Sequence, residues 1–318
     1  MKNQILILSQ TNMEAATDYV CMWLDFYKAT FTRLNGEDLF TLKGLGSLPK
    51  NEDVAMVWYR RKVASFPTRY KLKKENFDNQ YVMDRFLNNE YDVLHNHLCY
   101  LIDKQKWLND PATEDKLNKL SVLFLAKKLG LNIPHTEVLT DKRSLIELMQ
   151  IYPQLIVKPL SECVLFSDND GAYFKMLTEV ISIRNIKAVP ETFFPSLVQQ
   201  GINKKFELRV FYLAGVFYAM AIFSQENKKT VSDFRNYDDK RPNRTVPYIL
   251  PYEIENKLSH LMTALSFETG SIDLMVDREG NYYFLEINPE GQFGMVSHPC
   301  NYYLEREMAK VLTNKCSA

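Results

Sequence analysis

GSIDLMVDREGNYYFLEINPEGQFG, residues 270–294, contains two apolar segments separated by a polar turn. The segments are Ile272–Val276 and Tyr282–Ile287, and the turn between them is Asp277-Arg278-Glu279-Gly280-Asn281. Apolar runs that flank a short polar segment with Gly predict a β-hairpin. We therefore expect two antiparallel strands near the C-terminus of the chain.

Each predicted strand carries one acidic residue among apolar neighbours, Asp273 on the first and Glu286 on the second. A buried carboxylate is costly unless it is paired or binds a cation. Asn288 lies two residues after Glu286, and alternate residues of a strand point to the same face. Two carboxylates and an amide oxygen on one face predict a Mg²⁺ site shared with phosphate oxygens. The alternative is that both acids are satisfied by turn amides, which an acid pair ending in Glu-Ile-Asn-Pro makes less attractive.

Composition limits the classes of function. The 318 residues have room for two or three domains, and Lys+Arg equals Asp+Glu at 39 each, so no net charge attracts nucleic acid or a membrane. The five cysteines include no close pair, which disfavours a zinc site or a disulfide framework and fits a reducing compartment. The first apolar run, Ile5–Leu8, is too short for a signal peptide or a membrane span. We expect a cytoplasmic protein.

Strand-like and helical segments alternate over residues 1–108, which favours a small α/β domain. Asn109-Asp110-Pro111 is the first predicted boundary, and the last third of the chain begins near Pro195. A hairpin is predicted within Ala172–Ile183, and a polar loop from Gln225 to Arg244. The predicted strands are Ile5–Leu8, Val54–Tyr59, Thr136–Leu139, Leu155–Val157, Ser196–Gln199 and Leu208–Ala219. The predicted helices are Asn12–Tyr27, Asn76–Asn89, Glu114–Leu129, Ser144–Gln150, Glu253–Phe267 and Tyr302–Leu312.

A strand junction has the features of a nucleotide-binding hinge. Gln199, Gln200 and Ile202 end one strand-like segment, and Glu207 and Arg209 lie at the start of the next. Backbone groups at such a junction can hold the edge of a base, and Glu207 can accept hydrogen bonds from ribose hydroxyls. The alternative is an ion pair between Glu207 and Arg209 on one face of a strand.

Two further basic residues are candidates for phosphate or substrate binding. Lys158 ends the apolar strand Leu-Ile-Val-Lys, and the following proline fixes the exit direction, so its cation suits nucleotide phosphates. Arg235 lies in the polar loop two residues after Asp233, which can orient it for a carboxylate or phosphate. The alternatives are a strand-end lysine and two solvated loop charges. No Gly-x-x-x-x-Gly-Lys-Ser/Thr loop occurs, and a protein kinase is disfavoured.

Together these motifs resemble the ATP-grasp superfamily over roughly residues 109–300. The superfamily's motifs follow the same order in this chain: Lys158, the hinge at Gln199–Ile202, Glu207, and then the acid pair Asp273 and Glu286. The strongest match is Leu285-Glu286-Ile287-Asn288-Pro289. The resemblance implies an α/β (α+β) ATP-grasp fold, in which an N-terminal α/β domain (1–108) precedes central (109–194) and C-terminal (195–318) subdomains that sandwich ATP. A second similarity, around Asn118-Lys119-Leu120, implies that Lys119 also holds phosphates.

More narrowly, three segments look like the graspetide (microviridin-type) peptide ligases, and most like the grasp-with-spasm maturases. They are Phe31-Thr32-Arg33-Leu34-Asn35, Trp58-Tyr59-Arg60-Arg61 and Asp233-Phe234-Arg235. This resemblance implies that ATP and Mg²⁺ drive the joining of Asp or Glu carboxylates of a ribosomally made precursor peptide to Thr/Ser hydroxyls or Lys amines. It also implies recognition of a leader that precedes the core peptide, and a homodimer.

The sequence departs from the ATP-grasp pattern at two places. Ser161-Glu162-Cys163 stands where many members have a Gly-rich loop, and Ser271 stands where dipeptide ligases often have Arg. Arg235, with Asp233, is therefore the candidate for holding the acyl centre, and Arg209 is a further catalytic candidate. Two other functions stay open: an ATP-grasp ligase that joins free amino acids or extends a peptide tail, and a non-catalytic nucleotide- or peptide-binding regulator.

Overall fold

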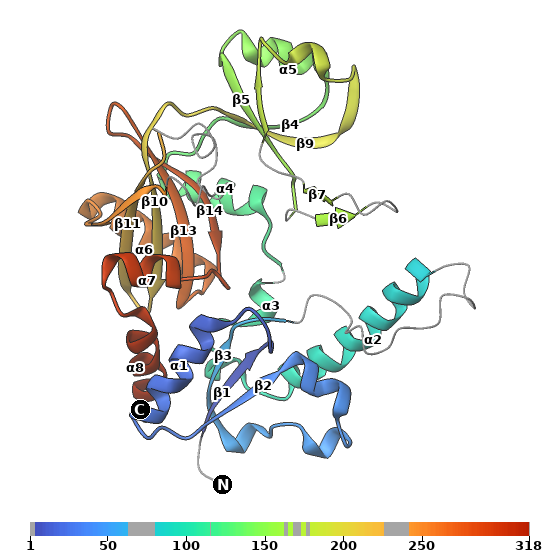
Figure 1. Cartoon of the computed structure of the whole chain (residues 1–318), viewed down its shortest axis with the longest axis vertical. Coiled ribbons are helices and arrows are strands. Elements are labelled where there is room, and N and C mark those ends of the chain that lie inside the picture. The colour runs from blue at the N-terminus through green and yellow to red at the C-terminus, as the bar shows by residue number, and fades with distance from the viewer. Residues whose placement is uncertain are drawn as a thin grey trace. The chain divides into compact units, whose positions relative to one another are not determined.

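The computed structural model of the chain describes residues 4–62, 80–114, 116–161, 165–167, 173–175, 179–225 and 242–317. These residues form two compact units (Figure 1). The first unit comprises Met1–Asp115, Ser266–Thr269 and Pro289–Ala318, and the second comprises Lys116–Leu265 and Gly270–Asn288. The division into three domains at residues 108 and 194 stays a prediction.

The first unit is built on a parallel sheet, as the alternation of strands and helices predicts. Its strands β1 (Gln4–Ser9), β2 (Phe31–Asn35) and β3 (Val54–Tyr59) lie in the order β2-β1-β3, with both neighbours parallel to β1. Parallel neighbours need a crossover connection, and helix α1 (Ala15–Phe26) supplies it between β1 and β2. The C-terminal helix α8 (Leu304–Ser317) packs against α1 and the sheet, so both ends of the chain belong to this unit.

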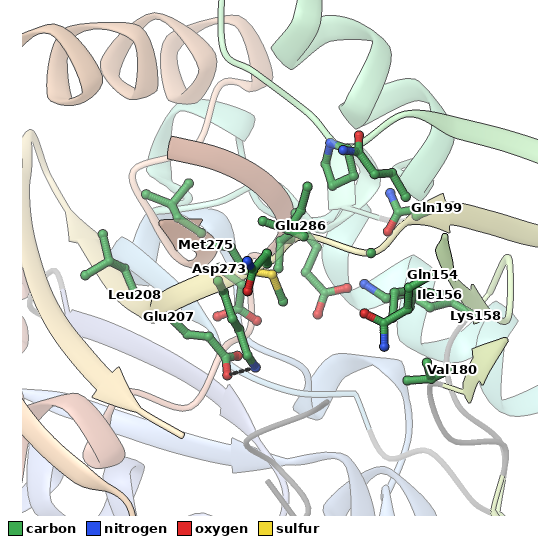
Figure 2. A pocket seen from close by; sticks show the side chains of 18 of the residues that line it. Gln154, Ile156, Lys158, Val180, Gln199, Glu207, Leu208, Asp273, Met275 and Glu286 are labelled. Carbon is green, nitrogen blue, oxygen red and sulfur yellow. Dashed lines mark hydrogen bonds and ion pairs between the residues drawn. The ribbon is translucent and has the colours of Figure 1, made fainter. Parts of the chain in front are cut away.

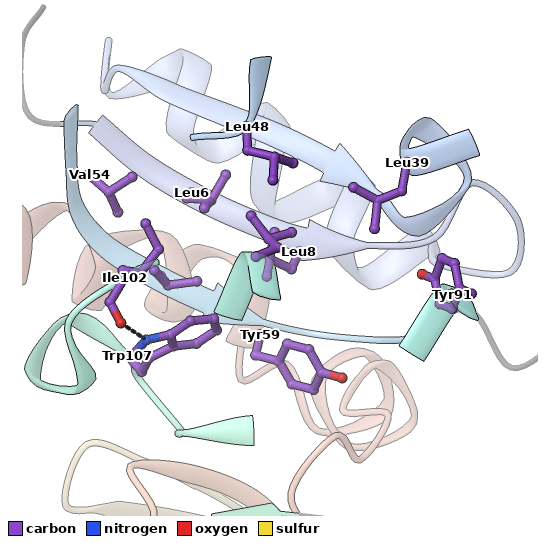
Figure 3. Packing of buried hydrophobic residues seen from close by; sticks show 11 residues of the cluster. Leu6, Leu8, Leu39, Leu48, Val54, Tyr59, Tyr91, Ile102 and Trp107 are labelled. Carbon is purple, nitrogen blue, oxygen red and sulfur yellow. Dashed lines mark hydrogen bonds between the residues drawn. The ribbon is translucent and has the colours of Figure 1, made fainter. Parts of the chain in front are cut away.

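The core of the first unit lies around β1 and β3 (Figure 3). Leu6 and Val57 are fully buried, and Trp107 packs beside them and donates its ring N–H to the carbonyl of Ile102 at 3.3 Å. Near-continuous burial along β1 and β3 is typical of parallel strands covered on both faces. The remaining helices of this unit are α2 (Gln80–Tyr100), α3 (Pro111–Glu114) and α7 (Gly294–Cys300).

The second unit contains a five-stranded sheet in the order β12-β11-β10-β13-β14, a four-stranded sheet in the order β4-β9-β5-β8, and the two-stranded sheet β6-β7. The five-stranded sheet comprises β10 (Lys204–Leu213), β11 (Val216–Phe223), β12 (Arg244–Tyr248), β13 (Thr269–Asp277) and β14 (Tyr282–Asn288). The other strands are β4 (Thr136–Asp141), β5 (Gln154–Lys158), β6 (Leu165–Ser167), β7 (Tyr173–Lys175), β8 (Glu179–Ser182) and β9 (Thr192–Gln200). The helices are α4 (Lys119–Lys128), α5 (Lys142–Met149) and α6 (Tyr252–Leu265). Short 3₁₀ helices occur in the two units at Gly36–Thr41, Leu45–Ser47, Asn51–Asp53, Lys104–Lys106 and Ile186–Ala188.

Three expectations for local structure were wrong. Leu208–Ala219 is not one strand, because the chain reverses between β10 and β11 through Ala214 and Gly215, whose φ angles are 46° and 93°. The expected hairpin within Ala172–Ile183 does not form, because β7 pairs with β6 and β8 pairs with β5. The helix expected from Glu114 begins later, at Lys119 as α4, and Glu114 is instead the last residue of the short helix α3.

The N-terminus of α4 has a physical cause. The side chain of Asn118 accepts a hydrogen bond from the backbone N–H of Ser121 at 2.9 Å, so it is an N-cap that starts the helix at Lys119. Strand β12 begins at the end of the predicted polar loop and was not expected, and residues 226–241 of that loop lie outside the described residues. No helix in the described ranges has both the length and the apolar character needed to cross a membrane.

Candidate active site

A cavity of about 410 Å³ lies in the second unit, at the ends of the strands that carry most of the predicted site residues (Figure 2). This volume lies within the usual range of small-molecule sites, roughly 300–1,000 Å³. Its apolar lining includes Ile156, Val180, Leu208, Met275 and Leu285. Its polar lining includes Gln154, Lys158, Gln199, Gln200, Lys204, Glu207, Asp273 and Glu286. Apolar walls with a few convergent polar groups are typical of small-molecule and cofactor sites.

The predicted C-terminal hairpin is confirmed, and its two acids face each other directly. Asp273 on β13 pairs in register with Glu286 on β14, and both side chains line the cavity. The register shifts after this pair, because Leu274 pairs with Phe284 and Leu285 is inserted as a bulge. Bulges re-aim neighbouring side chains, and this one lies beside the acid pair. Asn288 lies opposite Ser271, two residues beyond the acids on both strands, but it is exposed and is not part of the cavity lining.

Arg209 holds one of the two acids. Its guanidinium lies 2.6 Å from Oδ1 of Asp273, and the two side chains are 12% and 8% exposed. Strands β10 and β13 are neighbours in the sheet, which brings these residues together from positions far apart in the sequence. The arginine therefore fixes the carboxylate on which the predicted metal site depends. Its own Nε has no hydrogen-bond partner among the described residues.

Glu207 has a different partner, so the expected alternative of a Glu207–Arg209 ion pair was wrong. The carboxylate forms a buried ion pair with Lys204 and accepts a hydrogen bond from Ser224 Oγ at 2.7 Å. A dashed line marks the ion pair of Glu207 in Figure 2. Burial raises the pKa of Glu207 above its usual value, although Lys204 and Ser224 oppose that shift.

Sequence reasoning missed Lys204. Strand alternation places residues 205 and 207 on one face, so it favours Lys205 as the partner of Glu207. Lys205 is exposed instead, and Lys204 is 4% exposed and lines the cavity. The backbone N–H of Lys204 donates to the carbonyl of Ile202 at 2.8 Å, a local turn that strand periodicity does not describe.

The hinge between the two sheets is held by its own hydrogen bonds. Gln199 is 3% exposed and donates to the hydroxyl of Thr136 at 3.0 Å, while the backbone N–H of Gln200 donates to the carbonyl of His135 at 2.9 Å. Gly201 donates to the carbonyl of Gln154 at 2.8 Å, and a Cβ added at Gly201 would lie 3.0 Å from that same oxygen. The close backbone approach therefore favours glycine at this position.

The two predicted phosphate-binding lysines differ in position. Lys158 ends β5 and lines the cavity. Lys119, the first residue of α4, donates to the carbonyl of Ser161 at 2.8 Å and to that of Pro159 at 3.4 Å, so it fixes the segment that follows Lys158. Lys119 is not part of the cavity lining.

The residues present fit Mg²⁺. This ion is usually bound through one or two carboxylates together with substrate phosphates, so Asp273 and Glu286 suffice as protein carboxylates. Within the described ranges, no three His, Cys, Asp or Glu side chains gather into a denser metal-binding group. Asp233 and Arg235, the expected acyl-binding pair, lie outside the described residues, as do Glu162 and Cys163.

No protein-family profile matches the chain, and a search of curated proteins found no match. Solved structures match it over nearly its whole length. Macrocyclase MdnC from Microcystis aeruginosa MRC, bound with precursor peptide MdnA, superposes with a TM-score of 0.77 at 22% identity, covering 99% of this chain and 100% of that one. The chain has the ATP-grasp fold.

Two further structures with the ATP-grasp fold support this assignment. The Chryseobacterium gregarium RiPP-associated ATP-grasp ligase, in complex with ADP and a leader and core peptide, has a TM-score of 0.74 at 23% identity and covers 99% of this chain and 96% of its own. ATP-grasp ligase PsnB, complexed with a phosphomimetic variant of a minimal precursor, Mg and ADP, has a TM-score of 0.75 at 14% identity and covers 99% of both chains. The predicted α+β ATP-grasp architecture is therefore confirmed.

Proposed function

We propose that this chain is an ATP-dependent peptide macrocyclase. It activates Asp or Glu side-chain carboxylates of a ribosomally made precursor peptide and joins them to Thr/Ser hydroxyls or Lys amines. The observation that carries the proposal is the paired Asp273 and Glu286 lining a nucleotide-sized cavity. Its support from the comparisons is a fold similar, over 99% of the chain, to that of ligases solved with precursor peptides.

The cavity divides into regions that suit the parts of ATP. The hinge residues Gln199, Gln200 and Ile202 would frame the base, with Ile156 and Met275 among the apolar residues that pack against it. Glu207 would accept from ribose hydroxyls, and Lys158 would bind phosphates by charge-assisted hydrogen bonds. Lys119 would support this end by holding the backbone after Lys158.

The acid pair would hold Mg²⁺. Asp273 and Glu286 would supply carboxylate oxygens and Asn288 an amide oxygen, and Arg209 would keep Asp273 oriented through the 2.6 Å contact. Bound there, the ion would neutralise charge on the phosphate oxygens of ATP.

The proposed chemistry has two displacements. An oxygen of the substrate carboxylate attacks the γ-phosphorus of ATP, which gives an acyl phosphate and releases ADP. The hydroxyl or amine then attacks the acyl carbon, loses its proton and displaces phosphate. Arg235, oriented by Asp233, would anchor the carboxylate and stabilise the negative oxygen of the tetrahedral centre. Exclusion of water would protect the acyl phosphate from hydrolysis.

The proposal includes a leader and core peptide as partner, a cytoplasmic location, a homodimer, and no nucleic-acid or membrane partner. The balanced charge of 39 basic and 39 acidic residues supports the last of these.

Co-expression with the short peptide genes encoded beside this one, followed by mass spectrometry, tests the function. We expect the peptide to lose the mass of one water for each bond formed. Asp273→Asn and Glu286→Gln should abolish that loss, whereas Glu279→Gln, at an exposed position in the turn of the same hairpin, should not.

Each competing function gives a different result. A gain of mass by an added amino acid would establish a free-amino-acid or tail-extending ligase. Peptide binding with no mass change and no ATP consumption would establish a non-catalytic regulator. Full modification by both acid variants would show that the metal assignment is wrong.

A further inference from the structure

Two donors hold the same oxygen of Glu207. Nζ of Lys204 and Oγ of Ser224 both donate to Oε1, the serine at 2.7 Å. The donors come from two strands, because Lys204 begins β10 and Ser224 follows the last residue of β11. Ser224 is fully buried, and the side chains of Lys204 and Glu207 are 5% and 6% exposed. Two fixed donors on one oxygen restrict the rotation of the carboxylate.

The second oxygen of Glu207 is left for a ligand. Within the described ranges Oε2 accepts no hydrogen bond, and it is not enclosed by the protein as the unpaired Nε of Arg209 is. Glu207 lines the ATP-sized cavity (Figure 2), so a bound molecule can reach this oxygen. An ionised carboxylate only accepts hydrogen bonds, and hydroxyl groups are among its donors.

Lys204 also connects this acceptor to the hinge. Its backbone N–H donates to the carbonyl of Ile202 at 2.8 Å, in the turn that follows Gln199 and Gln200. Residues 199–204 and Glu207 all line the cavity. The groups proposed for the base and for the sugar therefore belong to one continuous segment, and the turn at Lys204 sets the spacing between them.

A purely structural role does not explain a charged pair in the wall of a cavity. Replacing a buried ion pair by apolar residues of similar volume is often neutral or stabilising, so packing alone does not call for Lys204. Burial raises the pKa of Glu207, and Lys204 opposes that shift, so the lysine favours the ionised carboxylate. Hydrogen bonds to an ionised acceptor are stronger than those to a neutral one.

We propose that Lys204 is a positioning residue that, together with Ser224, presents Oε2 of Glu207 to the ribose hydroxyls of a bound nucleotide and so makes the cavity select ribonucleotides. Lys204 acts through Glu207 and does not itself contact the sugar. The inference rests on the nucleotide site of the proposed function, and it adds the residues that decide which sugar this site accepts.

Calorimetric titration of the full chain with ADP and with 2′,3′-dideoxy-ADP, both with Mg²⁺, tests the proposal. The second probe lacks both ribose hydroxyls, and diphosphates avoid turnover during the titration. We expect the parent chain to bind ADP at least tenfold more tightly than the dideoxy compound, because hydrogen bonds to an ionised group are lost. Lys204→Met should reduce this ratio to about threefold or less, mainly by weakening ADP. Lys205→Met, at the exposed neighbouring lysine, should keep the parental ratio.

Two further variants keep the test usable if Lys204→Met fails to fold. Ser224→Ala removes the other donor but keeps the ion pair, and it should lower the ratio severalfold. Glu207→Gln should itself lower the ratio, and adding Lys204→Met to it removes both charges of the pair together. The double variant should have the same ratio as Glu207→Gln alone, because Lys204 acts through Glu207. A further fall would show that Lys204 contacts the sugar, which would overturn the positioning role.

The outcomes separate this inference from the proposed function. A ratio near one in the parent chain would overturn the inference. So would a parental ratio in Lys204→Met, or in Ser224→Ala where Lys204→Met does not fold, because a merely structural residue would weaken both nucleotides equally. Failure of the parent to bind either nucleotide would overturn the nucleotide site of the proposed function as well. Loss of water mass from the precursor peptide reports on the proposed function independently.

Discussion

At the scale of single residues, the buried ion pair of Lys204 and Glu207 shows how burial increases the contribution of a charge to stability. The two side chains are 5% and 6% exposed, so solvent screens them little. Breaking a buried pair by removing one partner leaves an uncompensated charge, which costs far more than losing a surface pair. Lys205, next in the chain and exposed, offers a matched comparison.

Lys204→Met should lower the free energy of unfolding by about 3–5 kcal/mol, because Glu207 is left buried without its counter-ion. Lys205→Met should change it by no more than about 0.5 kcal/mol. Urea denaturation of both variants beside the parent chain measures the difference. Equal effects of the two substitutions would contradict the burial argument.

The pH dependence of this loss follows from the raised pKa of Glu207. A carboxyl whose pKa is higher in the folded state contributes stability below its unfolded value, and that contribution is lost as pH rises through the folded pKa. Without Lys204 the pKa rises further. The loss of unfolding free energy caused by Lys204→Met should therefore grow as pH increases from 5 to 8. A loss that shrinks over this range would contradict the pairing of Lys204 with an ionised Glu207.

At the scale of elements, the β13–β14 hairpin is closed by one carboxylate. Asp277 accepts hydrogen bonds from the backbone N–H of Asn281 at 2.7 Å, the side-chain amide of Asn281 at 2.9 Å and the backbone N–H of Glu279 at 3.0 Å. Burial opposes ionisation, but these bonds and one from Tyr283 together hold the pKa of Asp277 below its usual value of 3.8.

Asp277→Asn should destabilise the chain at pH 7 by about 1–2 kcal/mol, because bonds to an ionised acceptor are lost. A carboxyl with a depressed pKa contributes stability above its unfolded value, and that contribution is lost as pH falls through its folded pKa. The difference in the free energy of unfolding between parent and variant should therefore decrease as pH falls from 5 to 2. Denaturation at several pH values measures it, and a constant gap would count against the role of this carboxylate.

Unlike the substitutions above, one substitution in the β10–β11 turn should stabilise the chain. Ala214 and Gly215 both have positive φ, 46° and 93°, and such turns favour Asn-Gly. Ala214→Asn should raise the free energy of unfolding by about 0.5–1 kcal/mol, and Gly215→Val should lower it by about 1–2 kcal/mol. Thermal unfolding of the two variants checks both signs. Stabilisation by valine would show that the turn has another conformation.

At the scale of the whole molecule, the site is assembled from strands of two sheets. Lys158 comes from the sheet β4-β9-β5-β8, and the acid pair comes from the sheet β12-β11-β10-β13-β14. A nucleotide that contacts both should stabilise the fold.

ATP with Mg²⁺, at a hundredfold excess over its dissociation constant, should raise the free energy of unfolding by about 2.7 kcal/mol. Chelation of the metal should remove most of that increase, and Glu286→Gln should reduce it. Thermal shift at a series of ATP concentrations provides the measurement. A melting temperature insensitive to ATP in the presence of Mg²⁺ would contradict the nucleotide site.

Short-range sequence patterns were enough to predict the C-terminal hairpin, the strands β1 and β3, and the order of the ATP-grasp motifs. Apolar runs and turn residues act over a few neighbours, so the sequence alone put Asp273 and Glu286 on the two strands of one hairpin. The bulge at Leu285, which brings the two acids opposite each other, was seen only in the structure. The same patterns misjudged β10 and β11, because an apolar run on both sides of Gly215 hides a two-residue turn in which even Ala214 takes a positive φ.

Only the tertiary structure decided which charges pair. Arg209 meets Asp273 because β10 lies beside β13, and Glu305 meets Ser297 because α8 packs against α7. The Arg209–Asp273 pairing depends on the order of strands in a sheet, which no local spacing records. Sequence periodicity describes one element at a time, whereas the satisfaction of a buried charge is settled between elements.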